Sequence, residues 1–233
     1  MKAYNIMDIK RRVRSIIDQN MEDGQLSANM DADTLELDDV IRENIVPGIR
    51  MVEIGAAFML LGNGKDFSEG LVGKPDPLVN DCMVFKMPKD YLRLVYFCMS
   101  SWRVGVSRTI SVQDPRYAMQ RGTVGMARGC AERPVVAEAY SKEGLTLEAY
   151  GCNSDDTVLV AQYIPEPAIN ESDQVVFPHR LEEASLYAIA ALTCTSFGDV
   201  GRAQIFMATA RQLGSIHIDS PEQQVEQNNT SDQ

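Results

Sequence analysis

The stretch 178-PHRLEEASLYAIAALTCTSFGDVGRAQIFMATARQLG-214 predicts two short helices that fold back on each other. Gly198 ends the first helix, Asp199 can cap the second, and Gly214 ends the second. Both helices carry apolar residues at helical spacing, and many of these are small enough for close helix packing. We therefore expect a helical hairpin over residues 178–214.

The first helix of this hairpin is apolar on more than one side. Opposite its main stripe it carries Tyr187, Ile189, Ala190, Cys194 and Phe197. A helix that is apolar all round must be covered, either by its own domain or by a neighbouring subunit. This is the first indication of a protein that assembles, and it makes Tyr187 a candidate interface residue.

Upstream of the hairpin, helices are followed by strands. Residues 4–62 carry helical periodicity, and Pro47 either kinks one of these helices or starts a third. Residues 79–165 are rich in β-branched and aromatic runs separated by turn formers. The strand candidates are 91–97, 104–112, 135–140, 145–150 and 157–164.

This order predicts an α+β fold, in which a small antiparallel sheet is inserted into a helical bundle made of the N-terminal helices and the C-terminal hairpin. We expect residues 1–218 to form a single domain. Residues 219–233 contain four acids, no base and one valine, so we expect a disordered acidic and polar tail.

The composition of the chain disfavours several classes of protein function. The 22 Lys and Arg against 33 Asp and Glu give a net charge of −11, which disfavours general affinity for phosphate backbones or anionic lipid. We expect no export signal and no membrane span. The five cysteines are widely spaced and form no Cys-x-x-Cys pair, which fits buried thiols in a reducing cytosol.

The candidate motifs for binding cofactors and metals do not match the patterns that such sites require. The segment Gly62-Asn63-Gly64-Lys65 lacks the upstream glycine, the following Ser or Thr and the preceding strand of a phosphate-binding loop. The two histidines, His179 and His217, are far apart in sequence. We therefore expect no catalytic residue, no cofactor and no metal ion.

The segment 101–133 is unusually basic for this chain. It contains six arginines, no lysine and two acids, a local charge of +4. Guanidinium groups favour two-pronged pairing with carboxylate or phosphate. Because the chain is rich in acids, we favour pairing with carboxylates, within or between subunits, over contact with DNA. The candidate interface residues are Arg103, Arg108, Arg116, Arg121, Arg128 and Arg133.

Several motifs together resemble the head-to-tail adaptor (ring or neck) proteins of short-tailed phages, the crAss-like group in particular. The motifs are 87-MPKDYLRLV-95, Trp102, 114-DPRYAMQR-121, 133-RPV-135, 147-LEAY-150 and 160-VAQYIP-165, and the terminal pair adds 181-LEEASLYAIAA-191 and 197-FGDVGRA-203. The resemblance covers most of the chain from Thr34 to Gly214. It rests on packing motifs and contains no chemical signature.

The resemblance implies a structural virion protein of the neck or tail region, made in the host cytoplasm. Such a protein forms a homo-oligomeric ring, implied to be twelve-fold, beneath the portal protein. It also meets other ring and tail proteins, and genomic DNA passes through its channel without sequence-specific binding. The resemblance makes the tail, with Val225, the expected portal contact.

Two other classes stay open. One is a cellular helical scaffold or adaptor protein, since the terminal helix pair resembles a repeat module. The other, more remote, is a small cytosolic enzyme that would use an acid pair, either Asp38 and Asp39 or Asp155 and Asp156, together with a thiol.

Overall fold

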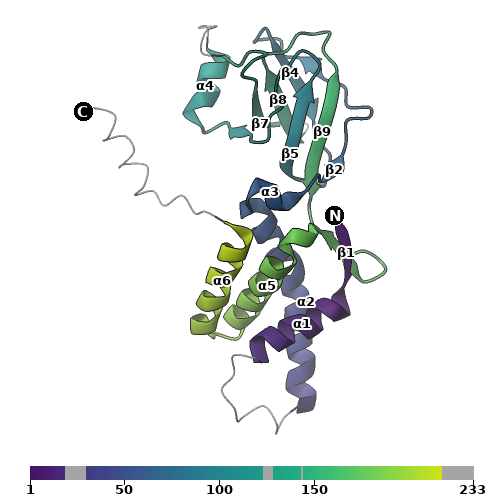
Figure 1. Cartoon of the computed structure of the whole chain (residues 1–233), viewed down its shortest axis with the longest axis vertical. Coiled ribbons are helices and arrows are strands. Elements are labelled where there is room, and N and C mark those ends of the chain that lie inside the picture. Colours follow the sequence, from purple (N-terminus) through teal and green to yellow (C-terminus); the bar gives the residue numbers. More distant parts are fainter. Residues whose placement is uncertain (19–29, 123–127, 143, 217–233) are drawn as a thin grey trace, which may run out of the picture. The chain divides into compact units, whose positions relative to one another are not determined.

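The computed structural model describes residues 1–18, 30–122, 128–142 and 144–216, and the chain divides into two compact units. The strand-rich unit comprises Met1 and residues 61–166, and the helical unit comprises residues 2–60 and 167–233 (Figure 1). The expected strand-rich segment 79–165 lies inside the first unit, and both ends of the chain supply helices to the second. The one domain expected over residues 1–218 stays a prediction.

In the helical unit, the hairpin expected from the sequence is confirmed as α5 (Glu182–Ser196) and α6 (Val200–Gly214), with a 3-10 turn at His179–Leu181 before α5. Asp199 caps α6 by accepting a hydrogen bond from the backbone N–H of Arg202 (3.1 Å). Gly198 has a φ of 79°, a left-handed conformation that suits glycine at the helix end.

The N-terminal part of the helical unit consists of α1 (Ile6–Asp18), α2 (Met30–Gly55) and the single turn α3 (Phe58–Leu61). α2 runs through Pro47, so no third helix begins at that residue. α5 packs against α1, α2 and α6, and the small side chains along it are buried among them. The apolar core of this unit includes Ile6, Val13, Ile45, Ile189 and Phe206.

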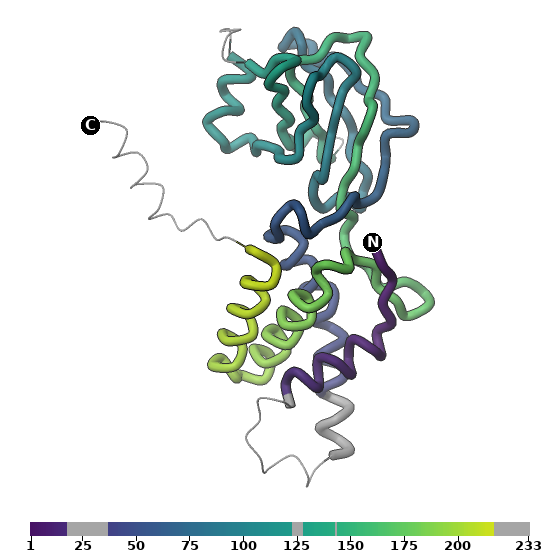
Figure 2. The backbone as a smooth tube through the Cα atoms, in the orientation of Figure 1, coloured from purple at the N-terminus to yellow at the C-terminus, as the bar shows by residue number. Residues whose placement is uncertain are grey.

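A two-stranded sheet joins the two ends of the helical unit. β1 (Lys2–Asn5) pairs antiparallel with β10 (Gln174–Phe177), with Lys2 opposite Phe177. The two strands lie side by side although one belongs to the start of the chain and the other to its last third (Figure 2). The rings of Tyr4 and Phe177 stack at 4.3 Å, which adds aromatic contact to the pairing.

The strand-rich unit contains two sheets. The first has the order β2 (Lys65–Asp66), β9 (Val158–Pro165) and β5 (Tyr91–Met99). The second has the order β3 (Lys74–Pro75), β4 (Cys82–Lys86), β8 (Gly144–Tyr150), β7 (Val135–Ser141) and β6 (Ile110–Ser111). β6 and β7 run parallel, and the other neighbours run antiparallel. The helix α4 (Pro115–Arg121) follows β6.

An aromatic and aliphatic core fills the strand-rich unit. Phe97 is fully buried and makes edge contacts with Phe85 (5.3 Å) and Trp102 (5.8 Å). The indole N–H of Trp102 donates to the carbonyl of Gly151 (2.9 Å), so this polar group is satisfied inside the core. Trp102 is the single tryptophan of the chain and therefore reports on this unit alone.

The expected fold class is wrong. The described residues form six α-helices and ten strands in three sheets, a mixed α and β architecture in place of a helical bundle with one small antiparallel sheet. The pairing of β6 with β7 is parallel. The expected strand 104–112 shrinks to Ile110–Ser111, with a bridge at Val106. Five of the ten strands have only two or four residues, too short for a periodic signal.

Candidate functional site

Three of the six arginines gather at one edge of the strand-rich unit. Arg108 lies two residues before β6 and Arg133 two residues before β7. Because β6 and β7 run parallel, both residues lie at the same end of the sheet. The backbone N–H of Arg103 donates to the carbonyl of Ala131 (2.9 Å), which brings Arg103 to the same turn. We call Arg103, Arg108 and Arg133 the arginine edge.

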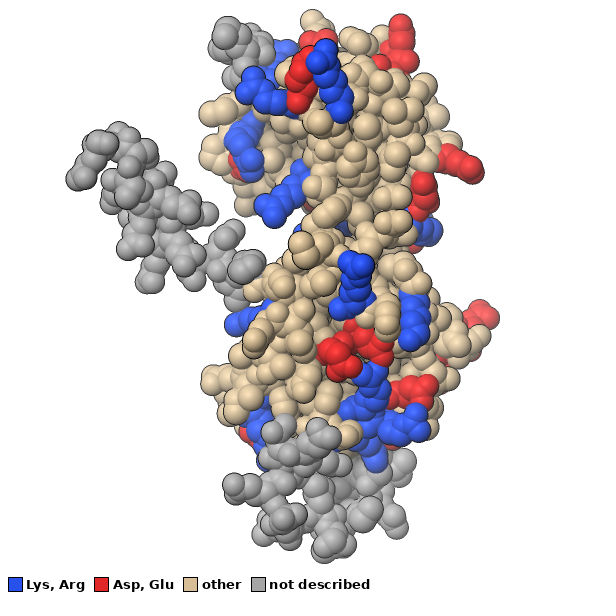
Figure 3. All heavy atoms as spheres, viewed as in Figure 1, with Lys and Arg blue, Asp and Glu red and all other residues tan. Residues whose placement is uncertain are grey.

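The arginine edge is exposed and holds excess positive charge. The Arg103 side chain is 76% exposed and reaches one acid, Glu132, at 3.5 Å. Within the described ranges, no acidic side chain lies within ion-pair distance of Arg108 or Arg133. Lys and Arg side chains gather on the side of this unit where α4 lies (Figure 3).

A fourth guanidinium, missed by the sequence analysis, adjoins this edge. Arg93 lies on β5, and both its burial and the positive charge of Arg108 lower its pKa. Its signal in the sequence is a single charged residue within the apolar run 91-YLRLVYF-97. Nearby, the carboxylate of Glu138 accepts hydrogen bonds from the hydroxyls of Tyr91 (2.6 Å) and Thr109 (2.9 Å).

Arg121 lies in an internal network. Its Nη1 donates to both oxygens of Glu148 (3.0 Å each), and its Nη2 donates to Asp76 (3.0 Å). The side chains of Asp76 and Glu148 are only 5% and 9% exposed. Glu148 also accepts from the hydroxyls of Tyr150 (2.5 Å) and Tyr117 (3.3 Å). One guanidinium therefore holds two buried carboxylates, and its partners belong to its own subunit.

Arg116 and Arg128 also bond locally. Arg116 donates to the carboxylate of Asp114 (2.6 Å), the residue that caps α4. Arg128 donates through Nε (2.9 Å) and Nη2 to the carbonyl of Gly122. The six sequence-predicted arginines thus divide into an exposed edge of three and three that stabilise α4 and its surroundings.

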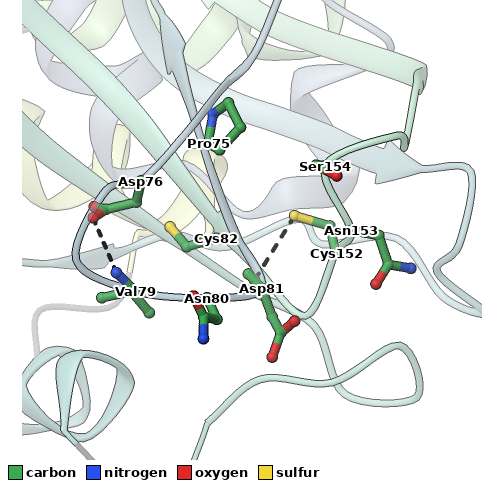
Figure 4. A pocket seen from close by; sticks show the side chains of 9 residues that line it. All are labelled: Pro75, Asp76, Val79, Asn80, Asp81, Cys82, Cys152, Asn153 and Ser154. Carbon is green, nitrogen blue, oxygen red and sulfur yellow. Dashed lines mark hydrogen bonds between the residues drawn. The ribbon is translucent and has the colours of Figure 1, made fainter.

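Figure 4 shows the residues that line a polar pocket of about 280 Å³. The pocket adjoins the Arg121 network through Asp76, which accepts a hydrogen bond from Arg121. Asp76 lies on its wall and accepts from the backbone N–H groups of Leu78 (2.7 Å) and Val79 (3.2 Å). Burial raises the pKa of the Cys152 thiol to about 11 and that of Cys82 further still. Both thiols are therefore protonated at neutral pH, and a protonated thiol is a poor nucleophile. The lining residues are Pro75, Asp76, Val79, Asn80, Asp81, Cys82, Cys152, Asn153 and Ser154.

One member of each acid pair considered for an enzyme has a structural role. Asp38 accepts from Arg14 (2.8 Å), which links α2 to α1. Asp156 accepts from the hydroxyls of Ser100 (3.2 Å) and Ser101 and from the backbone N–H of Asn153 (2.7 Å). In the part of the chain that the structure describes, no group of His, Cys, Asp and Glu side chains could hold a metal ion.

Most apolar side chains of α5 are buried within its own unit. Tyr187 is half-buried, and its ring lies 6.1 Å from that of Phe206 on α6. Phe197, which directly follows the last residue of α5, is 55% exposed. Further large exposed apolar side chains lie on other elements of this unit, among them Met7 on α1 and Val176 on β10. On α6 they are Val200, Ile205 and Leu213, and on α2 and α3 they are Met51, Ile54, Phe58 and Met59.

A second polar cluster ties α1 and β1 to the start of α5. The Tyr4 hydroxyl donates to Glu182 (2.8 Å), and Arg12 donates to Glu182 and Glu183. Burial raises the pKa of Glu182, but the hydrogen bonds from Tyr4 and Arg12 outweigh it, so the pKa lies below its usual range. The cluster borders a cavity of about 310 Å³.

Val225, His217 and the tail 219–233 lie outside the described residues. Among the helices that are described, none has the length and apolar composition to cross a bilayer. A comparison with known protein families and with curated proteins finds no family model and no curated protein that matches the chain.

Proposed function

We propose that this chain is a structural virion protein, a head-to-tail adaptor that forms a ring beneath the portal and extends the DNA channel. The observation that carries the proposal is the presence of two chemically different exposed surfaces, the arginine edge on one unit and the apolar residues of α6 on the other. A ring closes through head-to-tail contacts, which require two different surfaces on every copy.

Charge is also divided unequally between the two units. Residues 61–166 carry 12 Lys and Arg against 13 Asp and Glu, a net charge of −1. The other residues carry 10 against 20, a net charge of −10. Neighbouring copies can therefore bring a basic edge against an acidic unit, and complementary charge guides such an encounter.

The virion setting comes from the resemblance to the ring or neck proteins of crAss-like phages. In this setting the partners are further copies of the chain, the portal protein, other ring and tail proteins, and genomic DNA that slides past without sequence readout. The net charge of −11 suits such sliding because it opposes tight binding to phosphate.

Sedimentation velocity with and without the portal protein tests this function. We expect a monomer or small oligomer alone and a large closed oligomer with the portal. Ile205→Asp should weaken the large species because Ile205 is 64% exposed on α6, whereas the control Gln204→Asp changes an exposed polar neighbour and should leave it intact. A chain that stays small in the presence of the portal would contradict the adaptor function.

A further inference from the structure

We infer that the arginine edge binds the acidic segment 219–233 of a second copy of this chain. This inference rests on the proposed function, because it assigns the partner of a surface that ring formation would use. The bound segment is a stretch of this same chain, and its carboxylates pair with the guanidinium groups of the edge.

The arginine edge carries guanidinium N–H groups that can donate hydrogen bonds to a carboxylate. Arg108 and Arg133 lie at one end of the parallel pair β6 and β7, and both are exposed. Arg103 is 76% exposed, and its contact to Glu132 at 3.5 Å is too long for a strong hydrogen bond. Burial and the positive charge of Arg108 lower the pKa of Arg93 despite the opposing charge of Glu138, so a further carboxylate here would meet net positive charge.

Charge and length favour the acidic segment as the occupant. Segment 101–133 has a charge of +4, and residues 219–233 carry four acids and no base, a side-chain charge of −4. The four acids are spread over the segment at positions 219, 222, 226 and 232, so one extended strand of chain can meet several guanidinium groups. Fifteen residues can span at most about 50 Å when extended.

A photo-crosslinking experiment with the full chain tests the inference. p-Benzoyl-phenylalanine replaces Val225 in unlabelled chain, which is mixed with ¹⁵N-labelled wild-type chain, and the crosslinked peptides are mapped by mass. We expect crosslinks from unlabelled tails to labelled peptides covering residues 101–111 and 130–138. Raising the salt from 0.05 to 0.5 M should lower their yield by roughly tenfold, because screening weakens exposed ion pairs.

Matched variants separate this contact from general attraction to an acidic tail. Arg103→Glu, Arg108→Glu and Arg133→Glu combined should abolish the crosslinks. The control Lys74→Glu, Lys89→Glu and Lys142→Glu makes the same charge change at exposed lysines of the same unit and should preserve them. Trp102 fluorescence confirms that each variant is folded. Asp219→Lys, Glu222→Lys and Glu226→Lys alone should also abolish the crosslinks, and combining these changes with the arginine reversals should restore them.

Three results would overturn the inference: crosslinks from the unlabelled tail to unlabelled peptides only, equal loss in the lysine control, or crosslinks that form only to added portal protein. Failure of the adaptor function has a different signature. In that case the crosslinks between copies persist and respond to the charge reversals, while added portal protein produces no large oligomer.

Discussion

Arg121→Met tests the internal network most sharply. Methionine keeps most of the aliphatic stem and removes the guanidinium group that bonds to Asp76 and Glu148. Both carboxylates would then stay buried, at 5% and 9% side-chain exposure, without their cation. The matched control is Arg116→Met on the same helix, where the arginine is 68% exposed and pairs with a nearby acid.

The expected loss in the free energy of unfolding follows from the burial of the two carboxylates. Removing one partner of a buried ion pair costs about 3–5 kcal/mol. Arg121 itself is 30% exposed, and both carboxylates keep other hydrogen bonds, so we expect a loss of about 2–4 kcal/mol. The exposed pair of Arg116 should contribute less than about 1 kcal/mol. Adding Glu148→Gln to Arg121→Met should recover part of the loss, because it removes a carboxylate that has no cation.

The assay is urea unfolding followed by the fluorescence of Trp102, which is 6% exposed and lies in the same unit as Arg121. Linear extrapolation gives the free energy of unfolding for wild type and each variant. If Arg121→Met unfolds within about 1 kcal/mol of Arg116→Met, the buried network does not stabilise this unit and the reasoning fails.

Three further predictions concern other parts of the chain. Gly151→Ala should destabilise the strand-rich unit by about 1–3 kcal/mol more than Gly70→Ala. Both glycines have positive φ, but only at Gly151 would a Cβ meet backbone atoms, those of Cys130 at 2.7 Å, and equal urea midpoints would contradict this. Because the pKa of Glu182 is lowered in the folded state, its contribution to the stability of the helical unit is complete above the unfolded value of about 4.3 and is lost as pH falls through the folded pKa. Glu182→Gln should flatten the acid limb of a far-UV circular dichroism unfolding series, and an unchanged slope would refute it. A thiol reagent at pH 8 should modify exposed Cys130 before buried Cys82 and Cys152, as mass mapping would reveal, and early labelling of the buried pair would contradict their raised pKa values.

Elements with long, regular apolar patterns could be predicted from sequence. α1, α5 and α6 follow helical spacing, and β5, β7, β8 and β9 match the expected strands closely. β10 could not be predicted, because it has four residues and exists through its pairing with β1, 169 to 175 positions away in the chain. α4 was missed although Asp114 before Pro115 is a helix-start signal, because seven residues are too few to show periodicity.

The candidate site could be predicted only in part. The local excess of arginine was visible in the sequence, and the preference for carboxylate partners is confirmed for Arg121 and Arg116. Which arginines remain exposed depends on contacts between distant residues. The acids that bind Arg121 lie 27 and 45 positions away, and Arg108 and Arg133 lie at the same end of the sheet because β6 and β7 pair in parallel.

The most direct test of the central claim is the mass of the complex that the full chain forms with the portal protein, measured by native mass spectrometry. We expect a closed set of copies added to the portal, with about twelve copies of the 25.8 kDa chain contributing about 310 kDa. A complex with no added mass, or with a variable number of copies that grows with concentration, would contradict the claim that this chain forms a closed ring on the portal.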